Sequence, residues 1–262
     1  MDLGLAGHAY YVTGGSRGIG RALAELLLAE GASVATCARD ATALRAMSAA
    51  LPAEHSGRLL THVLDVRDAA ALDRAVDQAV DRFGRLDGVV ANAGAGVSGG
   101  VLTTPDTQWY NQFQVKVGSV LNLVTPALPA LRRSDAGRVV VVNGVTAHAP
   151  EPGMAAVSAA RAAVANLTRS LAVELAESGV LVNAISLGAI ATDRQRARYE
   201  TSGTSETFEA WSVAEADRRG VLLRRFGASH EVAPIAALLL SPLCSYVTGS
   251  SIDVSGGSGG RT

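Results

Sequence analysis

Lysine is almost absent from this chain of 262 residues. Lys116 is the only lysine, so every other basic residue is an arginine. Aromatic residues make up 4% of the sequence, which excludes a core built on rings and predicts one packed with alanine, valine and leucine. The two cysteines, Cys37 and Cys244, lie in apolar segments and are too few for a disulfide framework. We therefore expect reduced thiols, as in a cytoplasmic protein.

The chain also has almost no net charge and no long apolar segment. The formal net charge is −1 and the isoelectric point is about 6.5, so no strong field favours nucleic acid or an anionic membrane surface. No apolar run approaches the length needed to cross a bilayer. The opening sequence MDLGLAGHAYYVTGG has no basic region followed by an apolar run, so we expect no signal peptide. These absences predict a cytoplasmic protein with no nucleic acid and no membrane as partner.

Short apolar runs alternate with longer amphipathic ones along the chain. Apolar strands followed by helices are typical of a parallel sheet that is covered on both faces, so the pattern predicts an α/β fold with a doubly wound parallel sheet of about seven strands. No linker or repeat interrupts this order, and residues 1–262 are predicted to form a single domain. The predicted strands are 8–13, 33–37, 59–64, 87–91, 138–143, 180–186 and 250–254, and the predicted helices are 18–30, 40–51, 68–83, 106–133, 153–178 and 229–241.

One variable segment, at about 190–225, departs from this alternation. Residues 193–220 within it are polar and charged, and they predict a mobile excursion over the carboxyl edge of the sheet, where ligands bind in such folds. Its side chains suggest a cover for a small-molecule substrate that is partly apolar, and they leave open whether the substrate is anionic. These side chains are Arg194, Arg196, Arg198, Phe208 and Trp211.

A glycine-rich loop, TGGSRGIG at Thr13 to Gly20, lies between the first predicted strand and the first predicted helix. Glycines let the backbone approach a pyrophosphate, and the amino terminus of the helix supplies N–H groups and a positive dipole. A tight structural turn would have the same composition. Further motifs are needed to choose between a cofactor loop and a turn.

Those motifs follow later strands: Asp65-Val66, Asn92-Ala93-Gly94, Asn183-Ala184, and the run Gly188 to Thr192. Together with the loop they resemble the short-chain dehydrogenase/reductase family, a Rossmann-type fold that binds a nicotinamide cofactor. The resemblance covers essentially the whole chain, although Leu187 stands where the family usually has proline. It implies a cofactor site made of Gly14, Ser16, Arg17, Gly18, Ile19, Gly20, Arg39, Asp65, Val66, Asn92, Ala93, Gly94, Arg161, Gly188, Ile190 and Thr192.

The end of the second predicted strand bears on the choice of cofactor. Family members that prefer NAD carry an aspartate there, which repels a 2′-phosphate, and this slot holds Ala38. Arg39 follows it, and Arg17 lies in the glycine-rich loop. Two guanidinium groups converging there would bind a 2′-phosphate through charge-assisted hydrogen bonds, which predicts NADP(H). The alternative is that both arginines are solvated surface groups.

The slots that carry the family's chemistry are all changed. The resemblance implies a catalytic asparagine, serine, tyrosine and lysine, and these slots hold Lys116, Gly144, Val157 and Arg161. Val157 cannot transfer a proton, and Gly144 has no hydroxyl. None of the five tyrosines is followed four residues later by lysine, so a shifted alignment does not restore the missing pair.

Three residues remain as candidates for catalysis. Arg161 keeps a cation in the lysine slot but does not exchange protons readily. Lys116 is expected to lie near it, where a neighbouring cation and partial burial would lower its pKa enough for acid–base work. The alternative for Lys116 is a replaced structural asparagine whose ammonium points to water. His148, after the fifth predicted strand, could titrate near neutrality, and no metal-ligand spacing is present.

Three functions stay open. The protein is an NADP(H)-binding oxidoreductase with a non-standard active site, or a non-redox catalyst of cyclisation, elimination or isomerisation on the same scaffold. Alternatively, it is a catalytically inactive subunit or an NADP(H)-responsive binding module that partners an active enzyme. The long variable segment favours an enzyme. Because family members usually associate through the helices here predicted at 106–133 and 153–178, the resemblance implies a homo-oligomer, a dimer or tetramer, and leaves a hetero-oligomer with an active relative open.

Overall fold

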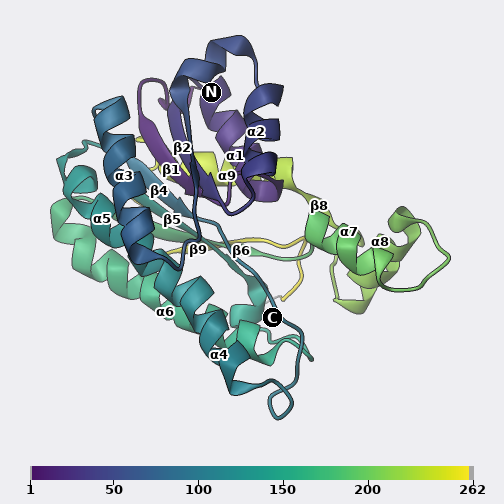
Figure 1. The fold of residues 1–262 in the computed structure, drawn as a ribbon. Helices are drawn as coiled ribbons and strands as arrows, with labels where there is room; N and C mark the ends of the chain where they lie inside the picture. The colour runs from purple at the N-terminus through teal and green to yellow at the C-terminus, as the bar shows by residue number, and fades with distance from the viewer. Residues whose placement is uncertain (1, 260–262) are drawn as a thin grey trace.

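A single parallel sheet organises the computed structural model, which describes residues 2–259 (Figure 1). Its strand order is β3-β2-β1-β4-β5-β6-β9, so the order of strands reverses between β1 and β4. This confirms the predicted Rossmann-type sheet, while the outer limits of the predicted domain lie outside the described residues. The strands are β1 Ala9–Thr13, β2 Ser33–Ala38, β3 Leu59–Val63, β4 Gly88–Ala91, β5 Arg138–Gly144, β6 Leu181–Leu187 and β9 Ser251–Val254.

Helices cover both faces of the sheet (Figure 1). One face packs against α3 (Ala69–Phe83), α5 (Ser119–Arg133) and α6 (Ala155–Leu175). The other packs against α1 (Gly18–Ala29), α2 (Ala41–Ala50) and α9 (Ser229–Leu240). Alternation along each strand sends side chains to opposite layers, as with the neighbours Tyr10 and Tyr11, which are both fully buried in different clusters. Among residues 2–259, no helix combines the length and apolarity that a bilayer span requires.

The helix predicted over 106–133 is interrupted in its middle. It begins as α4 (Asp106–Phe113), passes through one π-helical turn at Gln114–Gly118, and continues as α5. In that turn the N–H of Ser119 donates to the carbonyl of Gln114, five residues back. Such a turn inserts one residue into the helix and is frequent at functional sites. The turn carries Lys116 and contacts α6, so the only lysine stands on an irregular piece of backbone that faces the site.

The variable segment is folded, which corrects the expected mobile excursion. It contains β7 (Ile190–Ala191), α7 (Asp193–Glu200) and α8 (Phe208–Arg218), and β7 pairs with β8 (Gly227–Ala228). In Figure 1 the two helices project beyond the carboxyl ends of the strands.

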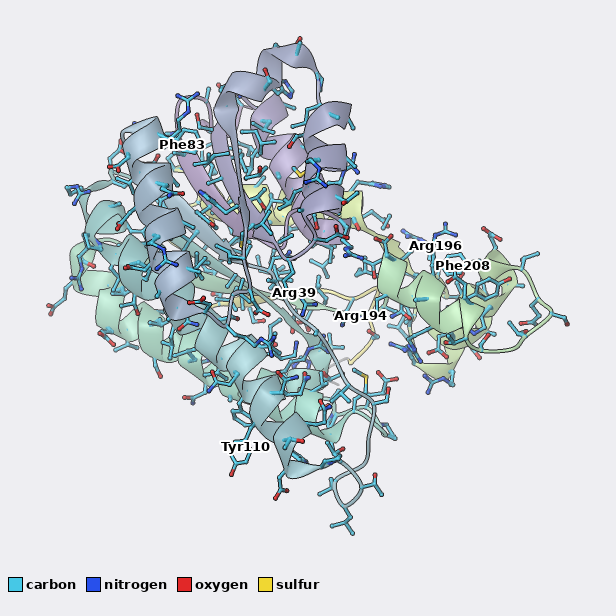
Figure 2. All side chains as sticks on the ribbon, viewed as in Figure 1. Arg39, Phe83, Tyr110, Arg194, Arg196 and Phe208 are labelled. Atoms are coloured by element: carbon cyan, nitrogen blue, oxygen red, sulfur yellow. The ribbon has the colours of Figure 1, made fainter. Side chains whose placement is uncertain are left out.

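A small aromatic core of its own holds this segment together. Tyr199, Phe208, Trp211 and Phe226 pack in edge-on and tilted pairs with ring centroids 5.5 to 5.9 Å apart. The guanidinium of Arg196 lies 4.5 Å above the ring of Phe208 (Figure 2). Phe208 and Trp211 therefore stabilise the cover itself, and the expectation that they form the substrate wall is wrong.

Candidate functional site

A cleft of about 1460 Å³ runs along the carboxyl ends of the strands. It extends from β2 and β3 past the reversal between β1 and β4 to the loop before α6, and α7 closes one side. Arg39, which follows β2, and Arg194, in α7, both line it and are labelled in Figure 2. Of the predicted cofactor residues, Gly18 and Gly20 do not line the cleft. Those that do are Gly14, Ser16, Arg17, Ile19, Arg39, Asp65, Val66, Asn92, Ala93, Gly94, Arg161, Gly188, Ile190 and Thr192.

The glycine-rich loop is tied to the end of β4. The side-chain amide of Asn92 donates to the carbonyl of Thr13 at 2.8 Å, and the Thr13 hydroxyl accepts from the N–H of Asn92 at 3.0 Å. Gly14 has φ of 73°, and a Cβ there would lie 3.0 Å from the Cα of Ala93, so only glycine fits. Helix α1 then starts at Gly18 without a side-chain cap. Its uncapped first turn leaves N–H groups for an anion such as a phosphate.

Two arginines stand at the β2 end of the cleft. Arg17 lies 3.7 Å from Asp40, and Arg39 lies 3.9 Å from Asp65. Asp65 is held more closely by Arg67, whose hydrogen bonds lower the pKa of the carboxyl group. The side chains of Arg17 and Arg39 are 59% and 72% exposed, so their long ion pairs leave most of their N–H groups free. This donor set suits a second phosphate beyond the one at α1.

At the opposite end, the guanidinium of Arg161 lies over Gly144. A Cβ at position 144 would be 2.7 Å from Cζ of Arg161 and 2.8 Å from its Nη1. The same Nη1 donates to the hydroxyl of Thr146 at 2.8 Å. The carbonyl of Arg161 accepts from the side chain of Asn143, which fixes the helix against β5. Because residue 144 is a glycine, the space that its side chain would fill is open, and the guanidinium of Arg161 occupies that space.

Lys116 reaches the same end of the cleft from the π-helical turn. Its Nζ lies 3.4 Å from where a Cβ of Gly94 would stand. Burial, and then the charges of Arg161 and Arg194, lower its pKa to about 7. Near neutral pH the side chain therefore exists both as an ammonium and as a neutral amine, which is the condition for an acid–base group.

Arg194 brings a third cation to this point from α7. Its guanidinium donates to the carbonyl of Gly94 at 2.9 Å and comes within 3.4 Å of where a Cβ of Gly96 would stand. The sequence predicts Arg194 in the segment that covers the cleft. Only the fold brings it beside Lys116, because the two residues lie in elements that are far apart in the sequence. We call Lys116, Arg161 and Arg194 the three-cation cluster.

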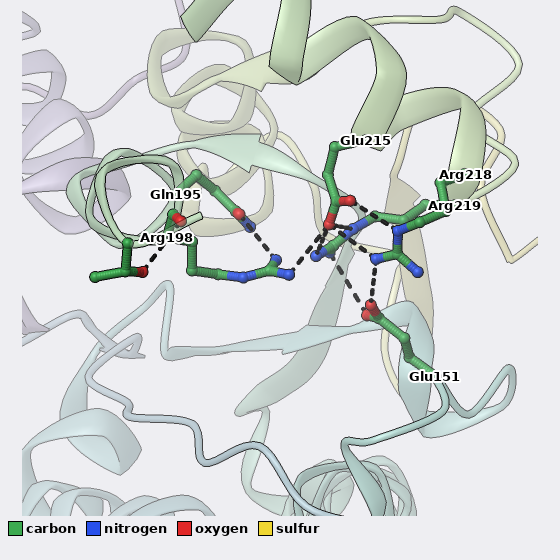
Figure 3. A network of polar contacts seen from close by, with 7 residues as sticks. Glu151, Gln195, Arg198, Glu215, Arg218 and Arg219 are labelled. Carbon is green, nitrogen blue, oxygen red and sulfur yellow. Dashed lines mark hydrogen bonds and ion pairs between the residues drawn. The ribbon is translucent and has the colours of Figure 1, made fainter. Parts of the chain in front are cut away.

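A network of ion pairs holds α7 and α8 in place over the cleft (Figure 3). Glu215 of α8 accepts from Arg198, Arg218 and Arg219, and Arg218 also donates to Glu151 in the loop before α6. The hydrogen bond from Arg218 is the main cause that lowers the pKa of Glu215 to about 2. Because Glu215 is nearly buried, we interpret the network as a structural contact that holds α7 and α8 together and not as a set of solvated surface ion pairs. Sequence spacing indicates the pairs of Glu215 with Arg218 and Arg219, which are three and four residues away on α8, but gives no sign of the contacts with Arg198 and Glu151.

Known proteins resemble this chain over nearly its whole length. The sequence profile of the family described as "Enoyl-(Acyl carrier protein) reductase" matches residues 14–259. The 3-oxoacyl-[acyl-carrier-protein] reductase FabG of Salmonella typhimurium is 31% identical over 250 residues, which are 94% of this chain and 95% of that protein. The chain belongs to the short-chain dehydrogenase/reductase family.

Solved structures of this family superpose closely on the chain. One is a short-chain oxidoreductase from Pseudomonas aeruginosa PAO1 that contains an atypical catalytic centre. Its apo structure has a TM-score of 0.92 at 41% identity and covers 98% of both chains. Its NADPH-bound structure has a TM-score of 0.90 and covers 95% of this chain and 96% of that one. L-sorbose reductase from Gluconobacter frateurii, complexed with NADPH and L-sorbose, has a TM-score of 0.94 at 26% identity over 100% of both chains.

Two residues of the chemical half lie apart from the cleft. Val157, in the slot of the family's tyrosine, is 1% exposed in the body of α6. His148 is exposed and does not line the cleft, and its Nε2 lies 3.2 Å from the carbonyl oxygen of Gly259. The structure thus brings together Lys116 and Arg161 of the three candidates, and it corrects the expectation that His148 stands at the reacting centre.

One group of possible metal ligands lies at the opposite, amino edge of the sheet. It consists of His8, Asp87 and Asp135. Both oxygens of Asp87 already accept hydrogen bonds from the guanidinium of Arg85. A metal ion there would compete with a guanidinium for the same carboxylate, so the geometry favours a structural ion pair.

We expect Gly144→Ala to destabilise the protein by about 1 kcal/mol, the contribution of one hydrogen bond, because the new methyl group must push Arg161 off Thr146. Thermal melting should show a Tm lower by about 2–4 °C. In an Arg161→Lys background the same substitution should cost much less, since no guanidinium fills the space. Equal costs in both backgrounds would contradict the arrangement.

The single lysine allows its titration to be followed directly. Protein carrying ¹³Cε-labelled lysine should give one side-chain signal whose midpoint lies near pH 7. Because the folded pKa is below the unfolded one, the unfolded state binds more protons above pH 7, and stability should rise from there towards the ordinary lysine pKa. Arg194→Gln removes a like charge and should raise the midpoint. A midpoint near the ordinary lysine value would refute this description of the site.

Proposed function

We propose that the protein is an NADP(H)-dependent oxidoreductase that reduces a carbonyl group, with Lys116 donating the proton in place of the family's tyrosine. The observation that carries the proposal is the position of Lys116: its ammonium lines the cleft beside Gly94, with a pKa near 7. A group that titrates near the working pH is the best acid–base catalyst. Binding of NADPH by the Pseudomonas aeruginosa relative, whose catalytic centre is atypical, supports this assignment.

The residues of the cleft fit NADP(H). The uncapped start of α1 offers N–H groups for the pyrophosphate, and Gly14 keeps the backbone close to it. Arg17 and Arg39 would hold the 2′-phosphate, since the aspartate that excludes it in NAD-preferring relatives is replaced by Ala38. Bound NADPH supplies the hydride that goes to the substrate carbonyl carbon.

The proton comes from the chain. As the carbonyl carbon gains the hydride, the π-electron pair moves to the oxygen, which takes a proton from the Nζ of Lys116. The neutral amine is then reprotonated from water in the cleft. Arg161 stays cationic at neutral pH, because burial lowers its pKa only to about 10. Its positive charge keeps the proton on Lys116 labile and stabilises the oxygen as negative charge develops there.

The association state of the protein remains a prediction. Family membership supports a homo-oligomer, and exposed apolar residues lie on the helices implied by the resemblance. Phe113 is 40% exposed at the end of α4, and Val173 is 80% exposed near the end of α6. These exposed residues are compatible with a helix-to-helix contact between copies.

We expect Arg39→Ala to weaken NADPH binding about tenfold to a hundredfold and to leave NADH binding unchanged, because a charge-assisted hydrogen bond to the 2′-phosphate is worth about 1.5–3 kcal/mol. Fluorescence titration of both cofactors measures this. Arg21→Ala is the matched control, since Arg21 pairs with Glu25 and does not line the cleft. Equal affinity of the parent protein for NADH and NADPH would count against the assignment.

Replacement of Lys116 tests the proposed chemistry. The rate of NADPH oxidation with a panel of ketones and aldehydes should fall about 10²–10⁴-fold in Lys116→Met, the usual contribution of general acid catalysis. Lys116→Arg keeps the charge but not the labile proton, so it should bind NADPH and remain slow. Product formed without loss of NADPH absorbance would instead indicate a non-redox enzyme. No turnover together with a co-purifying active relative would indicate an inactive subunit.

A further inference from the structure

Within residues 2–259 no carboxylate lies within ion-pair distance of the three-cation cluster, and Glu151 acts on Arg161 only from farther away. Arg161 and Arg194 each make one described side-chain hydrogen bond, to the Thr146 hydroxyl and to the Gly94 carbonyl, and both acceptors are neutral. Lys116 makes none with its side chain in the same part of the chain. Each guanidinium has five N–H groups, so most of the donors of the cluster are left to a ligand.

The other arginines of the cleft each have a carboxylate within ion-pair distance. Arg17 and Arg39 lie near Asp40 and Asp65, and Arg198, Arg218 and Arg219 share Glu215 and Glu151. Asp40, Asp65 and Glu151 line the cleft, and each already has an arginine partner. Asp193 is the remaining lining carboxylate in the described residues; it is exposed in the first turn of α7 and forms no ion pair there. Among the described residues, the cations of the cleft that have no carboxylate within ion-pair distance are therefore the three of the three-cation cluster.

Unpaired like charges at one point destabilise a folded protein unless a ligand compensates them. Burial, and then the like charges of Arg161 and Arg194, lower the pKa of Lys116, so the ammonium form is disfavoured in the cluster. Apolar side chains face the same space, among them Val97 and Met154. A ligand that satisfies both features has an anionic group on an apolar body.

We infer that the substrate is a carbonyl compound that bears a carboxylate, and that Arg194 binds this carboxylate while the carbonyl oxygen faces Lys116. The inference rests on the proposed function for the position of the carbonyl and extends it to the class of substrate. A guanidinium pairs with a carboxylate through two parallel hydrogen bonds, which fixes the orientation of the substrate. The bound negative charge also favours the ammonium form of Lys116, so binding of an acidic substrate increases the fraction of Lys116 that can donate a proton.

Binding of matched acids and esters tests the inference without requiring turnover. Calorimetry on protein saturated with NADP⁺ would compare benzoylformate, 3-benzoylpropionate and 4-benzoylbutyrate with their methyl esters, which keep the carbonyl and lose the charge. We expect at least one acid to bind tenfold or more tightly than its ester. Arg194→Gln should abolish this preference, and Arg194→Lys should restore part of it.

Arg196→Gln is the control on the same helix. Arg196 lies on the ring of Phe208 and does not line the cleft, so its substitution should leave the preference for acids unchanged. Acids that bind no more tightly than their esters would overturn the inference. So would an Arg194→Gln variant that weakens NADPH binding but keeps the preference, since Arg194 would then serve the cofactor. Acid-selective binding without NADPH oxidation would support the anion site and overturn only the proposed reaction.

Discussion

The contact between the Arg161 guanidinium and Gly144 is the constraint on which the catalytic edge depends. An arginine in this slot needs the volume that a side chain at position 144 would fill, and Thr146 supplies the hydrogen bond that holds it there. The same positive charge then acts on Lys116. Residues 116, 144 and 161 therefore depend on one another. The guanidinium of Arg161 fills the space that is open at Gly144, and its charge lowers the pKa of the Lys116 amine.

The cover over the cleft depends on a second set of charges. Glu215 is nearly buried and is compensated by three arginines, and Glu151 links the same cluster to the loop before α6. Replacing Glu215 would leave Glu151 as the remaining carboxylate of the network beside Arg198, Arg218 and Arg219, so their like charges would no longer be compensated. Because α7 carries Arg194, the network that orders the cover also positions one of the cations of the three-cation cluster.

Much of the fold could be predicted because its signals are local. Apolar runs and amphipathic periodicity located the seven strands of the sheet and the helices that pack on it, and the glycine-rich loop marked the turn from the first strand to the first helix. The π-helical turn at 114–118 could not be predicted, because one inserted residue barely changes a helical pattern. The helices α7 and α8 were missed because their polar sequence conceals an aromatic core that forms only when Tyr199, Trp211 and Phe226 meet.

The sequence by itself determined the architecture and the cofactor loop, since each depends on residues that are close together in the chain, and it predicts that Val157 and Gly144 stand in the slots of the family's tyrosine and serine. Only the tertiary structure decided that Arg161 occupies the space over Gly144, that His148 turns away, and that Arg194 joins Lys116 at Gly94. The physical reason is distance. Charge and steric contacts act over a few ångströms between segments far apart in sequence, and the packing of α6 and α7 on the sheet sets those distances.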